Sequence, residues 1–268
     1  MIGVDDVREQ TLDMSSSELI IGRWMKDRSM REAITLCTKV STGASAENVS
    51  KALSASLDRL KTDSVEVYKV HSPDPSVPIK ETMVALDEEV KAGRVGAVGG
   101  SNYSGSQLKE ALDASSDNGL ARFEVVQPPY NILQQEAEIN LFPLCRREQI
   151  AVTGYSPLGA GFLTGKYNPD RSKVPTQTRF GIAPGHINLY FSESNFTALK
   201  LLQKKAEELD LPMVQLAMSW AMSHPDVTTV LIGARTTAHI DNALEAYKTG
   251  MDPEMRSEIS AWITQPSF

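Results

Sequence analysis

The sequence predicts an α/β fold with parallel strands, of the (β/α)8 barrel type. Short apolar, β-branched runs recur along the chain, and helical patterns lie between them. The first five runs start roughly 25–30 residues apart, which is the length of a βα unit. Several runs are continuously apolar, which is typical of strands covered on both faces. The expected strands are Ile34–Val40, Val65–Val70, Val95–Gly99, Phe123–Val126, Ile150–Gly154 and Thr228–Ile232.

The segments between these strands carry apolar residues at helical spacing. In Glu47–Leu60, for example, Val49, Leu53 and Leu57 form one stripe. Pro143 lies inside one of the patterns, where we expect it to break the helix. The expected helices are Glu47–Leu60, Glu81–Ala92, Ser104–Leu112, Glu136–Glu148, Ser194–Leu209, Met213–Ser223, Thr236–Tyr247 and Pro253–Trp262.

Length and composition fit one globular domain that spans residues 1–268. Hydrophobic residues make up 41% and charged residues 23% of the 268, so disorder of the whole chain is not expected. The first residues, 1–16 and up to about position 20, show no strand pattern and are expected to be irregular. We expect a long loop over residues 156–190, whose middle part, Tyr167–Tyr190, is rich in Pro, Gly, Arg and Ser and is a usual place for a substrate lid.

Charge and cysteine content narrow the possible partners. The net charge of −7 disfavours a general nucleic-acid binder, because an acidic surface repels phosphates. Cys37 and Cys145 are too few for a disulfide framework, and together with the charged N-terminus they favour a reduced, cytoplasmic setting. No apolar run is long enough to cross a membrane. The sequence does not determine the oligomeric state.

Several common catalytic motifs are missing from the sequence. It contains no G-x-G-x-x-G, no complete phosphate-binding P-loop and no G-x-S-x-G. The four histidines are scattered and no H-E-x-x-H occurs, so no metal site is expected.

Polar residues instead follow successive strands. A single polar residue at a strand end is readily explained by its contact with water. Five successive strand ends that each carry a polar residue favour a shared site instead, because the C-terminal face of a parallel barrel is its active-site face. The groups are Lys39, His71, Ser101 with Asn102, Gln127, and Tyr155 with Ser156.

In these motifs the chain resembles the aldo-keto reductase superfamily, from about Ser17 to Tyr247. No single one of these motifs identifies the family, but the complete set of motifs in this order and at this spacing is specific for it. The segments that carry the resemblance are Ser17–Gly22, Thr38–Val40, Val70–Asp74, Gly99–Asn102, Gln127–Asn131, Gly154–Leu158, Gly161–Tyr167 and Ile232–Arg235.

The resemblance implies a (β/α)8 barrel that binds NADP(H) and transfers hydride between the nicotinamide and a small carbonyl compound. Lys39 and His71 match two members of the family's catalytic tetrad. Ser101, Asn102 and Gln127 match residues that hold the nicotinamide carboxamide, and Tyr155 matches the aromatic ring that stacks on the nicotinamide. The remaining implied cofactor-binding residues are Ser156, Pro157, Leu158, Gly159, Gly161 and Lys166 at the pyrophosphate, and Ile232, Gly233, Ala234, Arg235, His239 and Asn242 at the adenosine and its 2′-phosphate.

The chain also departs from the family pattern. The family's catalytic Asp and Tyr have no clear counterpart: no tyrosine precedes Tyr68, and Asp6 or Asp13 would stand in for the aspartate only by a loose alignment. We therefore expect an N-terminally shortened member with altered early strands. Three interpretations stay open: a slow or altered NADP(H)-dependent oxidoreductase, a non-catalytic NADP(H)-binding or regulatory protein, and a short product that needs a partner chain.

Overall fold

The computed structural model describes residues 16–263. The expectation of irregular structure before Ser16 lies outside the described residues, as do Asp6 and Asp13. The chain divides into two compact units, residues 1–126 (unit 1) and 127–268 (unit 2). The prediction that 1–268 forms one domain stays a prediction. No helix within 16–263 combines the length and the apolar character that a membrane span needs.

Unit 1 is built on parallel strands whose order in the sheet follows the chain. Its strands are β1 (Cys37–Val40), β2 (Val65–Val70), β3 (Val95–Ser101) and β4 (Phe123–Gln127), the last of which ends at the first residue of unit 2. Val40 of β1 is the register partner of Val70 in β2, and Val70 is in turn the partner of Gly100 in β3. This register aligns the C-terminal ends of β1, β2 and β3.

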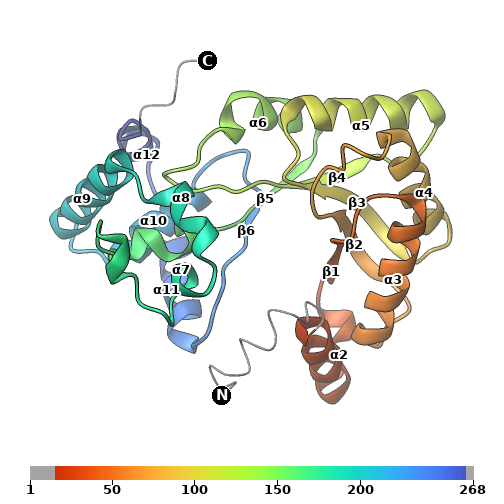
Figure 1. Cartoon of the computed structure of the whole chain (residues 1–268), viewed down its shortest axis with the longest axis horizontal. Coiled ribbons are helices and arrows are strands. Elements are labelled where there is room, and N and C mark those ends of the chain that lie inside the picture. The colour runs from red at the N-terminus through yellow and green to blue at the C-terminus, as the bar shows by residue number, and fades with distance from the viewer. Residues whose placement is uncertain (1–15, 264–268) are drawn as a thin grey trace. The chain divides into compact units, whose positions relative to one another are not determined.

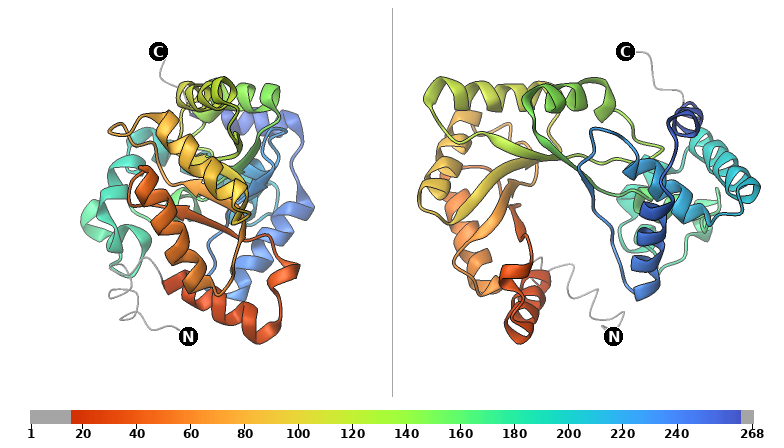
Figure 2. Two further views of the ribbon diagram at one scale, coloured as in Figure 1. Left: turned by 90° about the vertical axis from the view of Figure 1, so that its right-hand side faces the viewer. Right: turned by 180° about the vertical axis from the view of Figure 1, so that it is seen from behind.

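The helices of unit 1 alternate with its strands, as predicted (Figure 1). They lie in front of the strands in the left view of Figure 2. In the first long helix the predicted stripe of Val49, Leu53 and Leu57 is buried. Its N-terminus is capped by Ser45, whose hydroxyl accepts a hydrogen bond from the Asn48 N–H. The helices are α2 (Ser16–Arg28), α3 (Ala46–Leu60), α4 (Ile79–Lys91) and α5 (Gly105–Asn118), with a short 3-10 turn η1 at Arg31–Ala33.

Helix α2 corrects the expectation that the first 20 residues are irregular, because residues 16–20 are helical. Gly22 packs so tightly against α3 that a Cβ there would lie 2.5 Å from the Arg59 carbonyl oxygen. The Glu18 carboxylate pairs with Arg59 at 2.6 Å and accepts a hydrogen bond from the Thr38 hydroxyl. Tertiary contacts therefore stabilise α2. It could not be predicted from the sequence because its apolar residues form no clear stripe at helical spacing.

Two further boundaries in unit 1 differ from prediction. Strand β1 starts at Cys37 rather than Ile34, because the N–H of Leu36 donates to the Glu66 carboxylate at 2.7 Å instead of to a strand carbonyl. Helix α5 continues past Leu112 to Asn118 and ends at Gly119, whose positive φ of 63° suits a glycine.

Unit 2 contains the parallel pair β5 (Ala151–Gly154) and β6 (Thr229–Val230), in which Gly154 is the partner of Val230. With the four strands of unit 1, residues 16–263 contain six strands with helices between them. This element order is that of an incomplete (β/α)8 fold and confirms the predicted fold class. The long helices of unit 2 are α6 (Ala137–Glu148), α9 (Glu193–Glu208), α10 (Met213–Met222), α11 (Thr237–Thr249) and α12 (Pro253–Ser260).

The predicted break at Pro143 does not occur, since α6 runs through it. Proline removes the hydrogen bond to the carbonyl of residue i−4, here Ile139. Both Pro143 and Ile139 are exposed, so water can solvate that carbonyl. Phe142 and Leu144 on either side of the proline are buried, and their packing holds the helix together.

The segment 156–190 is folded into short turns rather than an open loop. Aromatic side chains from these turns pack on one another, with the Tyr167 and Phe180 ring centroids 4.6 Å apart and those of Phe162 and Tyr190 6.1 Å apart. All four rings are buried. The lid role of the segment stays a prediction. The turns are η2 (Gly159–Thr164), η3 (Arg171–Lys173), α7 (Arg179–Ile182), η4 (Pro184–His186) and α8 (Ile187–Tyr190).

A partly buried charge network joins α6 to α12. The Glu138 carboxylate accepts hydrogen bonds from Tyr130 at 2.6 Å and Arg256 at 2.8 Å, and His224 lies 3.6 Å away. Burial raises the pKa of Glu138, but the hydrogen bonds from His224, Tyr130 and Arg256 outweigh it and lower the pKa to about 2. Because the ordinary value is 4.5, this carboxylate stabilises the fold above that pH, and the contribution is lost as the pH falls towards 2.

We predict that Glu138→Gln lowers the free energy of unfolding at pH 7 by about 2–4 kcal/mol, because Arg256 loses its charged partner. The difference from the parent should shrink as the pH falls from about 4.5 to about 2. Urea unfolding at several pH values measures this. The control is Glu245→Gln, an exposed acid on α11 that pairs with Lys248. A pH-independent difference would contradict the assignment.

Candidate functional site

Lys39 and His71 lie at the ends of the neighbouring strands β1 and β2. The His71 N–H donates to the Val40 carbonyl at 2.9 Å, which extends the ladder by one residue and fixes the histidine beside β1. Alternation along each strand puts Lys39 and His71 on the same sheet face, because Lys39 is the register partner of Lys69, two residues before His71. The structure thus brings these two predicted catalytic residues together.

Ser101 and Asn102 follow the same edge at the end of β3. The Asn102 side-chain N–H donates to the His71 carbonyl at 2.8 Å, with Asn102 in the left-handed conformation at φ 62°. Ser101 is buried. The preceding Gly100 is required by packing, since a Cβ there would lie 2.7 Å from the Tyr103 ring. The two predicted carboxamide-binding residues of unit 1 are therefore held next to His71.

The electrostatics at this edge favour the neutral imidazole. Burial of the ring, and then the positive charge of Lys39, lower the pKa of His71 below its ordinary 6.5. Asp74 in the following loop is held as an anion, since the Ser76 hydroxyl, the Ala44 N–H and the Ser76 N–H all donate to it and lower its pKa. A hollow of about 120 Å³ beyond the two strand ends is lined by Val40, Ser41, Gly43, Val70, Ser72, Pro73, Asp74 and Pro75.

Gln127 and Tyr155 occupy the corresponding positions in unit 2. Gln127 is the last residue of β4 and is buried. Tyr155 follows β5 directly, and its backbone is clamped on both sides: its N–H donates to the Pro128 carbonyl at 3.0 Å, and its carbonyl accepts from the Tyr130 N–H at 2.9 Å. The phenol is half-buried, and this burial raises its pKa. The ring is thus held at the strand end in its neutral form.

A tight turn follows Tyr155. Ser156, Gly159, Ala160 and Gly161 all have positive φ, between 55° and 88°. The turn also contains the predicted residues Pro157 and Leu158, of which Pro157 is buried. A Cβ at Gly159 would lie 2.9 Å from the Tyr190 ring, so this position needs a glycine. Within the turn, the N–H groups of Gly159 and Gly161 donate to the Ser156 and Leu158 carbonyls at 2.9 Å each.

Lys166 closes the same turn. Its amine lies 5.2 Å from the centroid of the neighbouring Tyr167 ring, and a Cβ at Gly161 would lie 3.2 Å from that amine. The predicted pyrophosphate loop therefore places one cation against its glycine turn.

The segment 232–242 lies beside this turn within unit 2. Ile232 and Leu158 both pack against the buried cluster of Met218, Ala243 and Ala246. The two predicted cofactor-binding segments are therefore supported by the same part of the core. Next in the chain come Gly233, Ala234 and Arg235, all exposed, which lead into the N-terminus of α11.

Two of the predicted adenosine-site residues have structural partners in this segment. The Nδ1 of His239 accepts a hydrogen bond from the Arg235 backbone N–H at 3.0 Å. The Asn242 Oδ1 accepts from Gln215 of α10 at 2.9 Å, and its amide donates to the Ala238 carbonyl. Both fix the first turn of α11.

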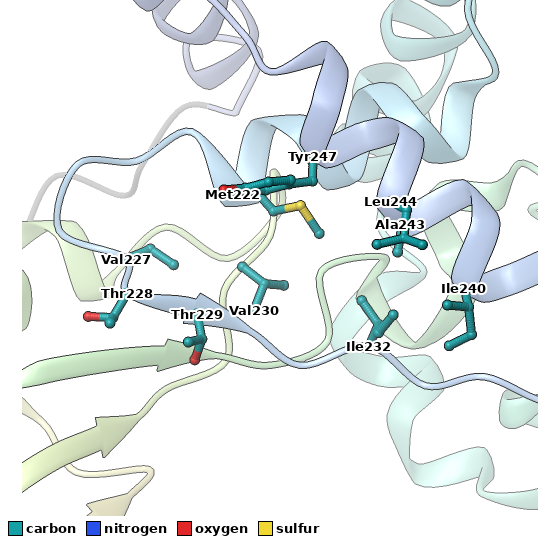
Figure 3. A pocket seen from close by; sticks show the side chains of 10 residues that line it. All are labelled: Met222, Val227, Thr228, Thr229, Val230, Ile232, Ile240, Ala243, Leu244 and Tyr247. Atoms are coloured by element: carbon teal, nitrogen blue, oxygen red, sulfur yellow. The ribbon is translucent and has the colours of Figure 1, made fainter. Parts of the chain in front are cut away.

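A larger hollow, of about 320 Å³, lies between β6 and α11 (Figure 3). Ile232 is the one predicted site residue that lines it, and no charged side chain does. Its polar side chains are the hydroxyl groups of Thr228, Thr229 and Tyr247. Its lining is Met222, Val227, Thr228, Thr229, Val230, Ile232, Ile240, Ala243, Leu244 and Tyr247.

Sequence reasoning missed three residues that support the site. The buried Asn131 donates to the Ser156 carbonyl at 3.1 Å and to Gln134 at 3.0 Å, and so anchors the glycine turn. Gln134 in turn accepts from the Tyr190 hydroxyl at 2.6 Å, and Gln215 holds Asn242. Asn131 is the last residue of Gln127–Asn131, one of the segments that carry the family resemblance, so the sequence contained a signal for it. Gln134 and Gln215 lie outside those segments.

The candidate residues divide between the two units. Lys39, His71, Ser101 and Asn102 belong to unit 1, and those from Gln127 onward belong to unit 2. In unit 1 these are the two predicted catalytic residues and two of the predicted carboxamide-binding residues, at the ends of β1–β3. Unit 2 contains Gln127, Tyr155 and the residues that are predicted to bind the pyrophosphate and the adenosine.

Comparison with known proteins gives a family match over most of the chain. The model of the Aldo/keto reductase family matches residues 13–263. A probable voltage-gated potassium channel subunit beta of Arabidopsis thaliana is 31% identical over 242 residues, 86% of this chain and 73% of the relative. Aldo-keto reductase YhdN of Bacillus subtilis (strain 168) is 28% identical over 254 residues, 91% of this chain and 74% of the relative. The uncharacterized oxidoreductase YrpG of the same organism is 27% identical over 253 residues, 89% and 75% of the two chains.

We predict that an NMR titration finds the imidazole pKa of His71 below 6.5, and that Lys39→Met raises it part of the way back. The substitution removes the repulsion between two cations and leaves burial in place. Lys51→Met, at an exposed position on α3, serves as the control and should not change the titration. An unchanged His71 titration in Lys39→Met would show that the two residues do not interact.

Proposed function

Because the chain belongs to the aldo/keto reductase family, an oxidoreductase family, we propose that it is an NADP(H)-dependent oxidoreductase acting on the carbonyl group of an aldehyde, a ketone or a related small molecule. The observation that carries the proposal is the arrangement at β1–β3, where Lys39 and His71 face the same side and Asn102 holds the His71 backbone. A cytoplasmic location is part of the proposal.

The residues of unit 2 fit a dinucleotide phosphate by their chemistry. The positive-φ turn at 159–161 brings the backbone close to Lys166, and Lys166 supplies a cation there. Arg235 stands exposed just before the N-terminus of α11, where the helix dipole adds to its attraction for a phosphate dianion. The half-buried ring of Tyr155 offers a flat face for a nicotinamide. When bound, the reduced cofactor would supply hydride.

The chain's own part in the reduction is to stabilise and protonate the carbonyl oxygen. The Lys39 cation can stabilise negative charge that develops on this oxygen. The proton donor in this account is His71, since no tyrosine precedes Tyr68 and the Tyr68 hydroxyl is itself buried and donates to the Val49 carbonyl at 2.9 Å. With its pKa lowered, His71 is mostly neutral at pH 7, so the reaction is expected to be slow there and faster in mild acid.

A second candidate is a regulatory protein that binds NADP(H) without turnover. The observation in its favour is that relatives from Arabidopsis thaliana and from rice carry the printed name of probable potassium channel subunit beta. The same unit 2 residues would hold the cofactor in both candidates. Turnover distinguishes them.

We predict measurable, slow NADPH oxidation with a panel of aldehydes and ketones, at a rate that falls as the pH rises through the lowered pKa of His71. His71→Ala and Lys39→Met should each reduce the rate by about 10²-fold or more, because each removes a group that acts on the oxygen. Lys51→Met should match the parent. Tight NADPH binding with no turnover on any carbonyl would favour the regulatory candidate.

We further predict that the chain prefers NADPH to NADH, and that Arg235→Ala weakens NADPH binding about 10–100-fold while sparing NADH. The reason is that the 2′-phosphate distinguishes the two cofactors and needs a cation. Titration followed by nicotinamide fluorescence measures both affinities. The matched control is Lys248→Ala, which removes an exposed cation from the C-terminal end of α11, the helix that Arg235 precedes. Equal affinities for both cofactors in the parent would contradict this assignment.

A further inference from the structure

One buried hydroxyl group of unit 2 has no hydrogen-bond partner within residues 16–263. Tyr167 is only 5% exposed, and its hydroxyl oxygen is shielded from solvent. A buried hydroxyl without a partner costs free energy, so such a group in a native protein calls for an explanation. The Nε of Arg256 is also buried and unpaired among these residues, but the Arg256 guanidinium is held by Glu138 at 2.8 Å. The fold of the described residues gives the Tyr167 hydroxyl no comparable structural role.

The Tyr167 hydroxyl lies beside Gly161, in the glycine turn that Lys166 closes. A Cβ at Gly161 would lie 3.8 Å from the hydroxyl oxygen and 3.2 Å from the Lys166 amine. Both polar groups therefore lie on the side of Gly161 where any other residue would carry its side chain. The φ of Gly161 is 88°, which suits a glycine. The turn thus brings an ammonium group and a hydroxyl donor to one side of a residue that has no side chain.

The ring of Tyr167 belongs to the aromatic cluster of segment 156–190. Its centroid lies 4.6 Å from that of Phe180, and the Phe180 centroid lies 5.7 Å from that of Tyr190. All three rings are buried. Tyr167 therefore connects the glycine turn, through its hydroxyl, to the packing of the later turns α7 and α8, through its ring.

We propose that the Tyr167 hydroxyl binds the pyrophosphate of the dinucleotide together with Lys166, and so couples the bound cofactor to the packing of segment 156–190. This inference rests on the proposed function and adds a residue to it, because the family resemblance assigns Lys166 to the pyrophosphate and gives Tyr167 no role. A phosphate oxygen accepts hydrogen bonds from both an ammonium group and a hydroxyl, and its negative charge strengthens them. Binding would give the buried hydroxyl the partner that it lacks among the described residues.

A phosphate reaches the hydroxyl only after a movement of the glycine turn, because the hydroxyl is shielded from solvent. Lys166 is exposed and can bind the phosphate first. Ala160 adopts a φ of 55° without being a glycine, and release of this strain would favour the movement. We therefore expect binding in two steps, of which the second is a slower rearrangement of the turn.

The test is the substitution Tyr167→Phe, which removes the hydroxyl and keeps the ring. NADPH and NADH should both bind about tenfold more weakly, because both carry a pyrophosphate and both lose a hydrogen bond to a charged group. Arg235→Ala, by contrast, is expected to affect NADPH alone. Without cofactor, Tyr167→Phe should not lower the urea midpoint of unfolding, because the hydroxyl that it removes has no partner within residues 16–263.

The matched control is Tyr68→Phe. Tyr68 is also buried, but its hydroxyl donates to the Val49 carbonyl at 2.9 Å. This variant should lower the urea midpoint of unfolding and leave both cofactor affinities unchanged. The two substitutions make the same chemical change, so opposite patterns of affinity and stability separate a binding role of the hydroxyl from a structural one.

Hydrogen exchange tests the coupling to the aromatic cluster. Saturating NADPH should slow amide exchange across residues 168–190 in the parent, and it should do so less in Tyr167→Phe. A purely structural role of the hydroxyl would change the exchange of these residues without cofactor and leave the effect of the cofactor intact.

Cofactor affinities unchanged by Tyr167→Phe, or a midpoint of unfolding lowered as much as in Tyr68→Phe, would overturn this inference. A parent protein that binds NADPH and reduces no carbonyl compound would contradict the proposed function and leave the inference standing. A parent that binds neither NADPH nor NADH would contradict both.

Discussion

The parallel register of β1, β2 and β3 is the constraint on which the chemistry of this protein depends. The backbone hydrogen bond from His71 to Val40 continues the ladder past the last residue of β2, and the Asn102 amide then holds the His71 carbonyl from the side of β3. A shift of one residue in any of these strands would turn Lys39 or His71 to the helical face. The same register places Lys69 beside Lys39.

In unit 2 the comparable constraint is the anchoring of a strained turn. Ser156 and Ala160 adopt positive φ without being glycines, a conformation that persists only where the surroundings enforce it. Asn131 holds the Ser156 carbonyl, and the Pro128 and Tyr130 backbones clamp Tyr155 just before it. Backbone strain of this kind is typical of binding sites.

Strand positions, and with them the candidate residues, could be predicted from the sequence, because short runs rich in β-branched residues end at or beside Lys39, His71 and Gln127. What the sequence could not show depends on contacts between distant segments. Helix α2 is held by Glu18 with Arg59 and by a Gly22 that touches the α3 backbone. The helix continues through Pro143 because Phe142 and Leu144 are buried, whereas Ile139, whose carbonyl loses its helical hydrogen bond, is exposed to water.

The same reason explains the supporting residues that were missed. Gln134 and Gln215 have side-chain hydrogen-bond partners 56 and 27 positions away, and no motif in the sequence indicates these contacts.

The central claim is that a carbonyl compound is reduced at the edge where Lys39 and His71 meet. The most direct measurement is a single-turnover reaction with NADPH that carries deuterium at C4 of the nicotinamide, followed by mass spectrometry of the product. The account predicts one deuterium on the carbinol carbon, with the transfer lost in His71→Ala. Recovery of the carbonyl compound without deuterium, while the labelled cofactor stays bound and unoxidised, would contradict it.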